Sequence, residues 1–340
     1  MRYLGSAPWL ILMLTLHPAA GQTIGGAGAT FPYPLYAQWF DAYQKAHHGV
    51  EINYSPVGST NGIRLLLDGK VDFGASDGPM TDEQLAEAET KLKSTVLHFP
   101  TVLGAAVPAY NLPGLAEELN FTPETLSGIF LGAIRKWDDP SIARSNPGVK
   151  LPSNPITVVH RAEGSGTSYC WTDYLCKVSP EWRTRVGKGA SVAWPVGTAA
   201  NKNEGVAGLV KQTAYTIGYV ELAYALQNHI RFGRVRNSTG AFIRADSASV
   251  AAAASSVATT MPNHFRVSIT DAPGPKAYPI STFTWLLIPA SGSKPAERRV
   301  LISFLHWALT DGQRMVESLD YTPLPTDVAA RELKVLATVH

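Results

Sequence analysis

The segment from Ile156 to Ser168 (ITVVHRAEGSGTS) combines the chemical groups that bind a small oxyanion. An apolar stretch typical of a strand ends at Arg161, a Gly/Ser/Thr turn follows, and helical sequence then begins. A helix start offers unpaired N–H groups and a partial positive charge, and glycines let the backbone approach a ligand closely. Ser165 and Thr167 add hydroxyls, and Arg161 adds a forked, permanently charged donor. These residue types in this order predict an anion site.

Three further turns repeat parts of this pattern. The glycine-rich segment Gly25–Phe31 precedes helical sequence, which places Thr30 or Phe31 at a helix start. Ser59 follows one predicted strand and precedes a short helix, and Asp77 lies in the turn after another strand. Each turn alone is more typical of an ordinary cap. Together, four such turns predict an anion site lined mainly by neutral dipoles, with one arginine and one aspartate.

The glycines of the first turn superficially suggest a nucleotide site. Neither the G-x-G-x-x-G fingerprint nor the G-x-x-x-x-G-K-[ST] loop is completed. The sequence therefore excludes a dinucleotide or Walker-type site.

Composition sets the broad class of the protein. The chain has 340 residues, of which 45% are hydrophobic and 16% charged, so it can bury a large core and is long enough for two domains. The formal net charge is +2, and no basic run is present of the kind that follows a nucleic-acid backbone. Nucleic acid is therefore not expected as a partner. No cluster of metal-ligating residues is visible, so no metal and no cofactor are expected.

The N-terminus has the pattern of a secretory signal peptide, predicted over residues 1–21. Arg2 precedes the apolar run Trp9–Leu16, and small residues follow up to Gly21. The run is much shorter than the ~20 apolar residues of a spanning helix, which argues against a membrane anchor. Cleavage is expected after Ala20 or Gly21, with no cysteine nearby to carry a lipid. We expect a periplasmic protein.

Two cysteines, Cys170 and Cys176, fall in the helical sequence after Thr167. At a rise of ~1.5 Å per residue, positions six apart lie about 9–10 Å from each other, beyond the ~7 Å limit for a disulfide. We expect a pair of buried thiols.

Short β-branched strands and amphipathic helices alternate along the rest of the chain, as in an α/β protein with parallel sheets. Strands are predicted at 50–55 and 71–75, and helices at 63–67, at 81–93 with a threonine cap, and from Thr122 onward. Two strand-like stretches, 101–111 and 278–289, are candidate domain crossings. Two crossings give one discontinuous domain, one inserted domain and a cleft between them, where ligands commonly bind.

At these residues the sequence resembles the periplasmic phosphate-binding proteins of high-affinity phosphate ABC importers, which are type II solute-binding proteins. The resemblance covers nearly the whole mature chain in five separated motifs. The motifs are Gly26–Pro32, Val71–Asp77, Lys136–Asp139, Arg161–Thr167 and Gly218–Tyr224.

The resemblance implies a two-lobed α/β fold, each lobe a mostly parallel sheet flanked by helices, with two hinge crossings. Lobe I is expected over 22–108 and 284–340, and lobe II over 109–283. The resemblance also implies that the protein binds inorganic phosphate and delivers it to the membrane-embedded permease subunits of an ABC importer. We expect the protein to be monomeric. The implied phosphate contacts are Thr30, Phe31, Ser59, Asp77, Arg161, Ser165, Gly166 and Thr167.

Asp77 is expected to discriminate between anions. An ionised carboxylate only accepts hydrogen bonds, and phosphate at neutral pH still carries a proton to donate, whereas sulfate does not. Two positions depart from the family pattern. Glu163 replaces the common aspartate beside Arg161, and the Ser59 loop continues as Thr60-Asn61-Gly62, where asparagine is expected to tolerate a left-handed backbone.

A phosphatase or serine hydrolase is the alternative, with Ser165 or Ser59 as nucleophile and His160 as the histidine of interest. No G-x-S-x-G elbow surrounds either serine, so no catalytic residue is assigned and we expect a protein that is not an enzyme. A structural or adhesive surface protein on the same fold is a further alternative. Its exposed tryptophan patches are not indicated, since the eight tryptophans fall mostly in amphipathic segments typical of core.

Overall fold

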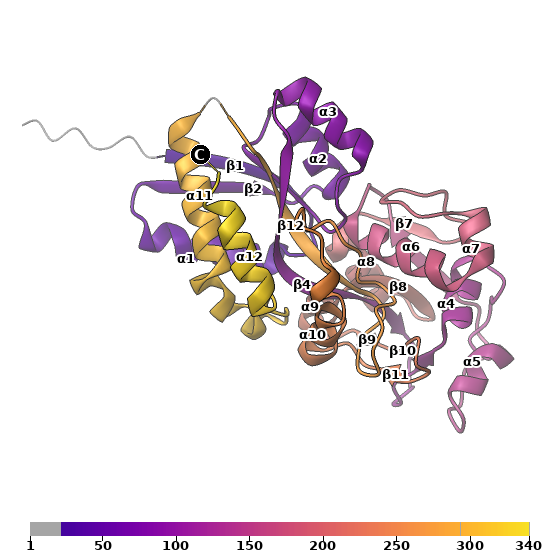
Figure 1. Ribbon diagram of the computed structural model, residues 1–340. Coiled ribbons are helices and arrows are strands. Elements are labelled where there is room, and N and C mark those ends of the chain that lie inside the picture. Colours follow the sequence, from indigo (N-terminus) through magenta and orange to yellow (C-terminus); the bar gives the residue numbers. More distant parts are fainter. Residues whose placement is uncertain (1–21, 293, 340) are drawn as a thin grey trace, which may run out of the picture.

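The computed structural model describes residues 22–292 and 294–339, and this part of the chain folds into two lobes that share one long strand, β4 (Val96–Asn111) (Figure 1). The predicted signal peptide lies outside the described residues. The large sheet has the order β2-β1-β3-β12-β4-β8-β6-β7, with β9 also beside β4. Along β4 the antiparallel partner changes between neighbouring residues, because Ala105 pairs with β12 and Ala106 pairs with β8. We call the two sides of this change lobe I and lobe II.

Lobe I contains the first strands of the chain and its C-terminal helices. Strand β1 pairs in parallel with both β2 and β3, while β12 is antiparallel to both β3 and β4. Its elements are β1 (Gln22–Gly28), α1 (Tyr33–Ala46), β2 (Val50–Ser55), α2 (Ser59–Leu67), β3 (Phe73–Ser76), α3 (Asp82–Leu92), β12 (Ser281–Pro289), α11 (Pro295–Leu309) and α12 (Thr326–Leu336).

Lobe II is built around the parallel strands β8, β6 and β7. The elements of its sheet and helices are α4 (Pro123–Phe130), α5 (Pro140–Ser145), β6 (Thr157–Arg161), α6 (Gly166–Val178), α7 (Pro180–Arg185), β7 (Thr198–Ala200), α8 (Lys202–Gln212), β8 (Thr216–Glu221), α9 (Leu222–Gln227) and β9 (Arg231–Phe232). A small second sheet joins β5 (Asn120–Phe121), β10 (Arg234–Arg236) and β11 (Phe242–Ile243), and α10 (Ser247–Ser255) packs against β4 and β12. The expected two-lobed α/β class is confirmed. The exact lobe limits at 108/109 and 283/284 stay predictions.

Two predicted helix starts have the expected caps, whereas α2 begins at Ser59, earlier than the predicted Ile63, and α1 begins at Tyr33, just after the predicted Thr30 or Phe31. Thr81 and Gln84 form a reciprocal capping box before α3, and the Thr122 hydroxyl accepts from the backbone of α4, whose first residue is Pro123. The tryptophans belong mainly to the core, as expected. Of the seven tryptophans in the described residues, five are fully buried: Trp39, Trp137, Trp171, Trp182 and Trp285.

The glycine run at 25–28 is a buried strand, β1, and not the turn that the sequence suggested. A Cβ on Gly26 would lie 2.1 Å from the Phe73 ring, and one on Gly28 would lie 2.0 Å from the Ala75 carbonyl oxygen. The glycines therefore allow β1 to pack tightly against β3, and the turn begins only after them, near Thr30. In the Ser59 loop the residue with positive φ is Gly58, at 91°, whereas Asn61 is helical, so the loop does not use the tolerance of asparagine for a left-handed backbone.

Both cysteines lie on α6, as the spacing argument assumed, and both are free thiols. Cys170 is buried but Cys176 is only partly so, and the expectation of two buried thiols is therefore right for Cys170 alone.

Candidate functional site

The predicted site residues come together where the two lobes meet. Thr30 follows β1, Ser59 begins α2, and Asp77 follows β3, all in lobe I. Arg161 ends β6 and Ser165 caps α6, both in lobe II. The side chains of Thr30, Ser59, Asp77, Arg161, Ser165 and Thr167 are at most 3% exposed. The turns that looked alike in the sequence thus face one buried point from both sides.

Arg161 connects the two lobes. Its Nη2 donates to Thr30 Oγ1 in lobe I at 3.3 Å, and its Nη1 donates to Thr167 Oγ1 in lobe II, also at 3.3 Å. Its Nε donates to Glu163 Oε1 at 3.0 Å, and Nη2 contacts the same oxygen. The guanidinium is therefore held by hydrogen bonds to one carboxylate and two hydroxyls, which fix its orientation in the site.

Glu163 performs the steadying role despite its extra methylene. Besides Arg161, its two carboxylate oxygens accept the Lys202 N–H at 3.1 and 3.2 Å. Burial opposes ionisation of Glu163, but the hydrogen bond and charge of Arg161 outweigh burial and lower its pKa. The departure from aspartate keeps an ionised partner for the arginine.

Ser59 links Asp77 to the start of α6. Its Oγ accepts the Gly166 N–H from lobe II at 3.0 Å and the Asp77 N–H at 3.3 Å, and it lies 3.4 Å from Asp77 Oδ2. The other oxygen, Asp77 Oδ1, accepts from the Thr284 hydroxyl on β12 at 2.9 Å. Asp77 is thus anchored at one oxygen, while the other receives only a long contact.

Burial raises the pKa of Asp77 to about 7, because the charged form loses its water. The Thr284 hydrogen bond, the charge of Arg161 and Ser59 act in the opposite direction but do not compensate. A carboxylate in this state gains from any further hydrogen-bond donor that enters the site.

At two of the predicted positions, Gly166 and Phe31, the expected contact is a backbone N–H, and that of Gly166 is engaged by Ser59 Oγ. Ser165 Oγ accepts the Ser168 N–H at 3.2 Å, which caps α6, and Gly166 is the first residue of that helix. Among the residues that the structure describes, no protein group accepts the Phe31 N–H. The contact region between the two lobes, which we call the seam, therefore combines the Arg161 guanidinium, several hydroxyls and a helix start. This combination suits an oxyanion.

Three tyrosines hold the backbone around Thr30. Tyr54 donates to the carbonyl of Ala29 at 2.7 Å, and Tyr321 donates to that of Phe31 at 2.6 Å. Tyr224, from lobe II, donates to the Thr30 carbonyl at 2.6 Å. Three consecutive carbonyls are thereby fixed by phenols from three different parts of the chain.

Sequence reasoning missed two residues of this network, Thr284 and Asn203. Thr284 lies inside an apolar hinge strand, and Asn203 lies in the first turn of α8 after a short edge strand. Asn203 is fully buried and contacts both Thr30 and Thr167. Neither residue follows a Gly/Ser/Thr turn, so the pattern that identified the other positions gave no signal for them.

The geometry of His160 is that of a structural histidine. Its ring stacks on Trp194 with centroids 5.0 Å apart, and its Nδ1 lies 3.0 Å from the Arg161 carbonyl oxygen. Within residues 22–292 and 294–339, His160 makes no hydrogen bond to Ser59 or Ser165, and no three His, Cys, Asp or Glu residues are grouped to hold a metal ion.

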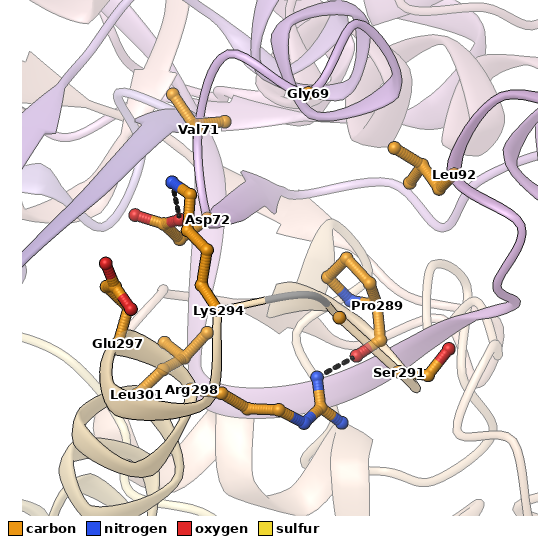
Figure 2. A pocket seen from close by; sticks show the side chains of 11 residues that line it. Gly69, Val71, Asp72, Leu92, Pro289, Ser291, Lys294, Glu297, Arg298 and Leu301 are labelled. Atoms are coloured by element: carbon orange, nitrogen blue, oxygen red, sulfur yellow. Dashed lines mark hydrogen bonds and ion pairs between the residues drawn. The ribbon is translucent and has the colours of Figure 1, made fainter.

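A separate pocket of about 190 Å³ lies in lobe I between α11 and the loop before β3 (Figure 2). Three of its charged side chains, those of Asp72, Lys294 and Arg298, are engaged with one another or with the backbone. Lys294 Nζ pairs with Asp72 Oδ1 at 3.1 Å, and Arg298 Nη1 donates to the Pro289 carbonyl at 2.8 Å. No predicted site residue lines this pocket.

Comparison with known proteins places the chain among solute-binding proteins. Residues 15–311 match the family model of the PBP superfamily domain. The chain is 42% identical over 308 residues to the phosphate-binding protein PstS of Pasteurella multocida, with 90% of this chain and 88% of that protein covered. It is 36% identical to PstS of Methanocaldococcus jannaschii, with 89% and 82% covered. The chain belongs to the PstS family.

Solved structures of the family's fold agree with the two-lobed architecture. The structure of a high-affinity periplasmic phosphate-binding protein, PfluDING, bound with phosphate, matches with a TM-score of 0.74 at 21% identity, covering 92% of this chain and 93% of that chain. An ABC-type phosphate transport receptor from Vibrio cholerae matches with a TM-score of 0.57 at 18% identity, covering 89% and 100%. At these identities the likeness concerns the fold. In the described part of this PstS-family chain, no helix has the length and apolar character needed to cross a membrane.

Proposed function

We propose that this protein binds inorganic phosphate between its two lobes and delivers it to the permease of an ABC importer. The observation that carries the proposal is the convergence of Arg161, Asp77 and four hydroxyls from both lobes at one buried point. The membership of the PstS family, whose members are named for phosphate binding, supports the same ligand. The proposed contacts are Thr30, Phe31, Ser59, Asp77, Arg161, Ser165, Gly166 and Thr167.

The chemistry of the site favours an anion that carries a proton. Arg161, the hydroxyls and the Phe31 N–H donate to unprotonated oxygens, whereas an ionised Asp77 only accepts. Phosphate offers both kinds of oxygen at neutral pH. Sulfate offers no proton and would bring its charge against a buried carboxylate, at a cost of several kcal/mol in order of magnitude.

The proposal extends to the cellular location of the protein, its oligomeric state and its macromolecular partners. We infer that residues 1–21 direct export, that the mature protein works in the periplasm as a monomer, and that its macromolecular partner is the permease and not nucleic acid. The absence of long basic runs and the near-neutral net charge of +2 support the last point.

We also infer that the site binds its ligand without turning it over. Ser165 is used as a helix cap, Ser59 receives two backbone N–H groups, and His160 is stacked on Trp194 away from a hydrogen bond with either serine. Neither Ser59 nor Ser165 therefore has a histidine placed to act as its base.

Calorimetric titration of the ligand-stripped mature protein with phosphate at neutral pH is the direct test. We expect tight one-to-one binding that an excess of sulfate does not displace, and no phosphate release from a phosphomonoester. The absence of heat with phosphate would overturn the proposed ligand. Hydrolysis that disappears in Ser165→Ala would overturn the assignment as a binding protein only.

A further inference from the structure

Asn203 lies at the centre of the interface between the lobes, although no sequence motif marks it. Its side chain is fully buried at the start of α8. Its Nδ2 donates to Thr30 Oγ1 in lobe I at 3.0 Å and to Thr167 Oγ1 in lobe II at 3.2 Å. One amide group therefore supplies both of its protons to hydroxyls of the proposed phosphate site, one on each lobe.

The orientation of this amide is determined by the backbone. Asn203 Oδ1 lies 3.0 Å from the Glu221 N–H. A backbone N–H only donates, so the atom facing it must be the acceptor oxygen. The NH₂ group is then directed at the two threonines, and the reverse orientation would place two donors against each other.

The Asn203 amide limits how the Thr30 and Thr167 hydroxyls can form further hydrogen bonds. A hydroxyl has two lone pairs and one proton. Thr30 Oγ1 receives hydrogen bonds from Asn203 and from Arg161 Nη2, and Thr167 Oγ1 receives them from Asn203 and from Arg161 Nη1. The Asn203 NH₂ group and the Arg161 guanidinium can only donate, so they occupy both lone pairs of each threonine hydroxyl. The proton of each hydroxyl then remains free to be donated to a ligand.

We propose that Asn203 is a positioning residue that fixes the Thr30 and Thr167 hydroxyls as hydrogen-bond donors to the bound anion. The inference rests on the proposed function and extends it to selectivity. With both threonines fixed as donors, they serve unprotonated oxygens, and a protonated phosphate oxygen is left to Asp77. Asn203 thus keeps two functions apart: the threonines bind unprotonated oxygens of the anion, and Asp77 binds a protonated one.

Two substitutions at this position separate hydrogen-bond polarity from packing. Asn203→Asp preserves the shape of the side chain but replaces the donor NH₂ by a carboxylate that accepts protons from the threonines. Asn203→Ala removes the side chain and introduces no acceptor. If polarity is what matters, we expect the phosphate Kd to rise at least tenfold in Asn203→Asp at pH 8 and less in Asn203→Ala. A residue that acts through packing would give the opposite ranking.

The pH dependence gives a second readout. The ratio of the Kd of Asn203→Asp to that of the parent, measured from pH 5.5 to 8, cancels the titration of phosphate in solution, which is the same for both proteins. We expect this ratio to rise with pH as the introduced carboxyl ionises and loses its ability to donate.

Asn146→Asp is the matched control. Asn146 is also buried, its Oδ1 also accepts a backbone N–H, at 2.8 Å from Asn120, and its Nδ2 donates to the Asn120 and Ile142 carbonyls, in the region of α5. This variant should lose thermal stability but keep the parent's phosphate Kd.

The outcomes are distinguishable. A parent protein that binds no phosphate would overturn the proposed function and this role of Asn203 with it. A parent that binds, together with an Asn203→Asp variant that binds within twofold of it at every pH, would overturn the role of Asn203 alone. If Asn203→Asp does not fold, Asn203→Leu decides, because leucine fills nearly the same space without any hydrogen bond. A loss of about fivefold or more in that variant supports the proposal, and parent-like affinity contradicts it.

Discussion

Two buried aspartates, Asp77 at the seam and Asp173 on α6, are equally removed from water but are paired in opposite ways. Asp77 is 1% exposed and Asp173 is 3% exposed. Lys177 and Lys188 each lie 3.2 Å from the Asp173 carboxylate, which also accepts from two hydroxyls, those of Ser268 and Thr270. The cation that acts on Asp77 is Arg161, which already pairs with Glu163.

The two surroundings move the pKa of the carboxyl groups in opposite directions. Burial opposes ionisation of both, but at Asp173 the lysines and hydroxyls outweigh burial and lower the pKa, whereas at Asp77 burial prevails and raises it to about 7. Asp173 therefore has its full complement of partners within the protein. Asp77 has a close donor at only one of its two oxygens, and a ligand with a proton can supply another.

Removing the seam's cation should have the largest effect. We expect Arg161→Ala to raise the phosphate Kd about a thousandfold, because the buried anion loses both the positive charge beside it and a charge-assisted hydrogen bond, together about 4 kcal/mol. Calorimetric titration measures this. The double variant Lys177→Ala/Lys188→Ala removes two cations from the Asp173 cluster and should leave the Kd unchanged. A comparable loss of affinity in that variant would mean that the two regions are not independent.

Removing the charge of Asp77 should weaken selectivity. In Asp77→Asn the amide can donate as well as accept, so sulfate no longer meets a like charge. We expect the preference for phosphate over sulfate to fall about a hundredfold, corresponding to a few kcal/mol. Competition titrations check this, with Asp173→Asn as the variant that should keep the preference. An unaltered preference in Asp77→Asn would show that another group reads the proton.

The same two substitutions should change stability with opposite signs. The folded pKa of Asp77, about 7, lies above its ordinary value of 3.8, so its ionisation destabilises the ligand-free protein fully above pH 7 and not at all below about pH 4. Asp77→Asn should therefore raise the free energy of unfolding by about 1–3 kcal/mol at pH 8 and bring no gain near pH 4.

For Asp173 the sign is reversed. Its lowered pKa stabilises the fold above the unfolded value and loses this effect as the pH falls through the folded value. Asp173→Asn should lower the free energy of unfolding by about 1–3 kcal/mol at pH 8, and this difference should shrink in acid. Urea unfolding of the ligand-free proteins at both pH values measures each shift. Equal signs for the two variants would contradict the comparison.

Restoring the common family residue should have the smallest effect. Glu163→Asp keeps a carboxylate beside Arg161, although the shorter side chain gives up its reach to the Lys202 N–H. We expect a phosphate Kd within about threefold of the parent, since the charge that steadies Arg161 remains. A change of tenfold or more in the same titration would mean that the Lys202 contact helps to set the site.

The sequence could predict those site residues that follow a strand and open a helix. Arg161, Ser165 and Ser59 lie in segments where an apolar run, small turn residues and a helix start succeed one another, and local chemistry alone determines their geometry. The structure brings together the turns after β2 and β6, where Ser59 Oγ accepts the N–H of Gly166, the residue after Ser165.

The remaining parts depend on tertiary contacts that leave no local pattern. Asn203 is important because α8 carries it to the point where hydroxyls of both lobes meet, and Thr284 because β12 lies beside β3. The glycines before Thr30 were read as a turn because glycine is common in turns. They belong to a strand because the Phe73 ring covers Gly26, a contact between residues far apart in the chain.

The three phenols on the carbonyls of Ala29, Thr30 and Phe31 have a kinetic consequence. Tyr54 and Tyr321 belong to lobe I, so they can keep this backbone in shape while the lobes are apart, and an arriving anion meets N–H groups that are already in position. The Tyr224 bond crosses the seam and must break each time the lobes separate. The hydrogen bonds from Arg161 and Asn203 to Thr30 cross it as well, so all three must break together before a bound anion can leave.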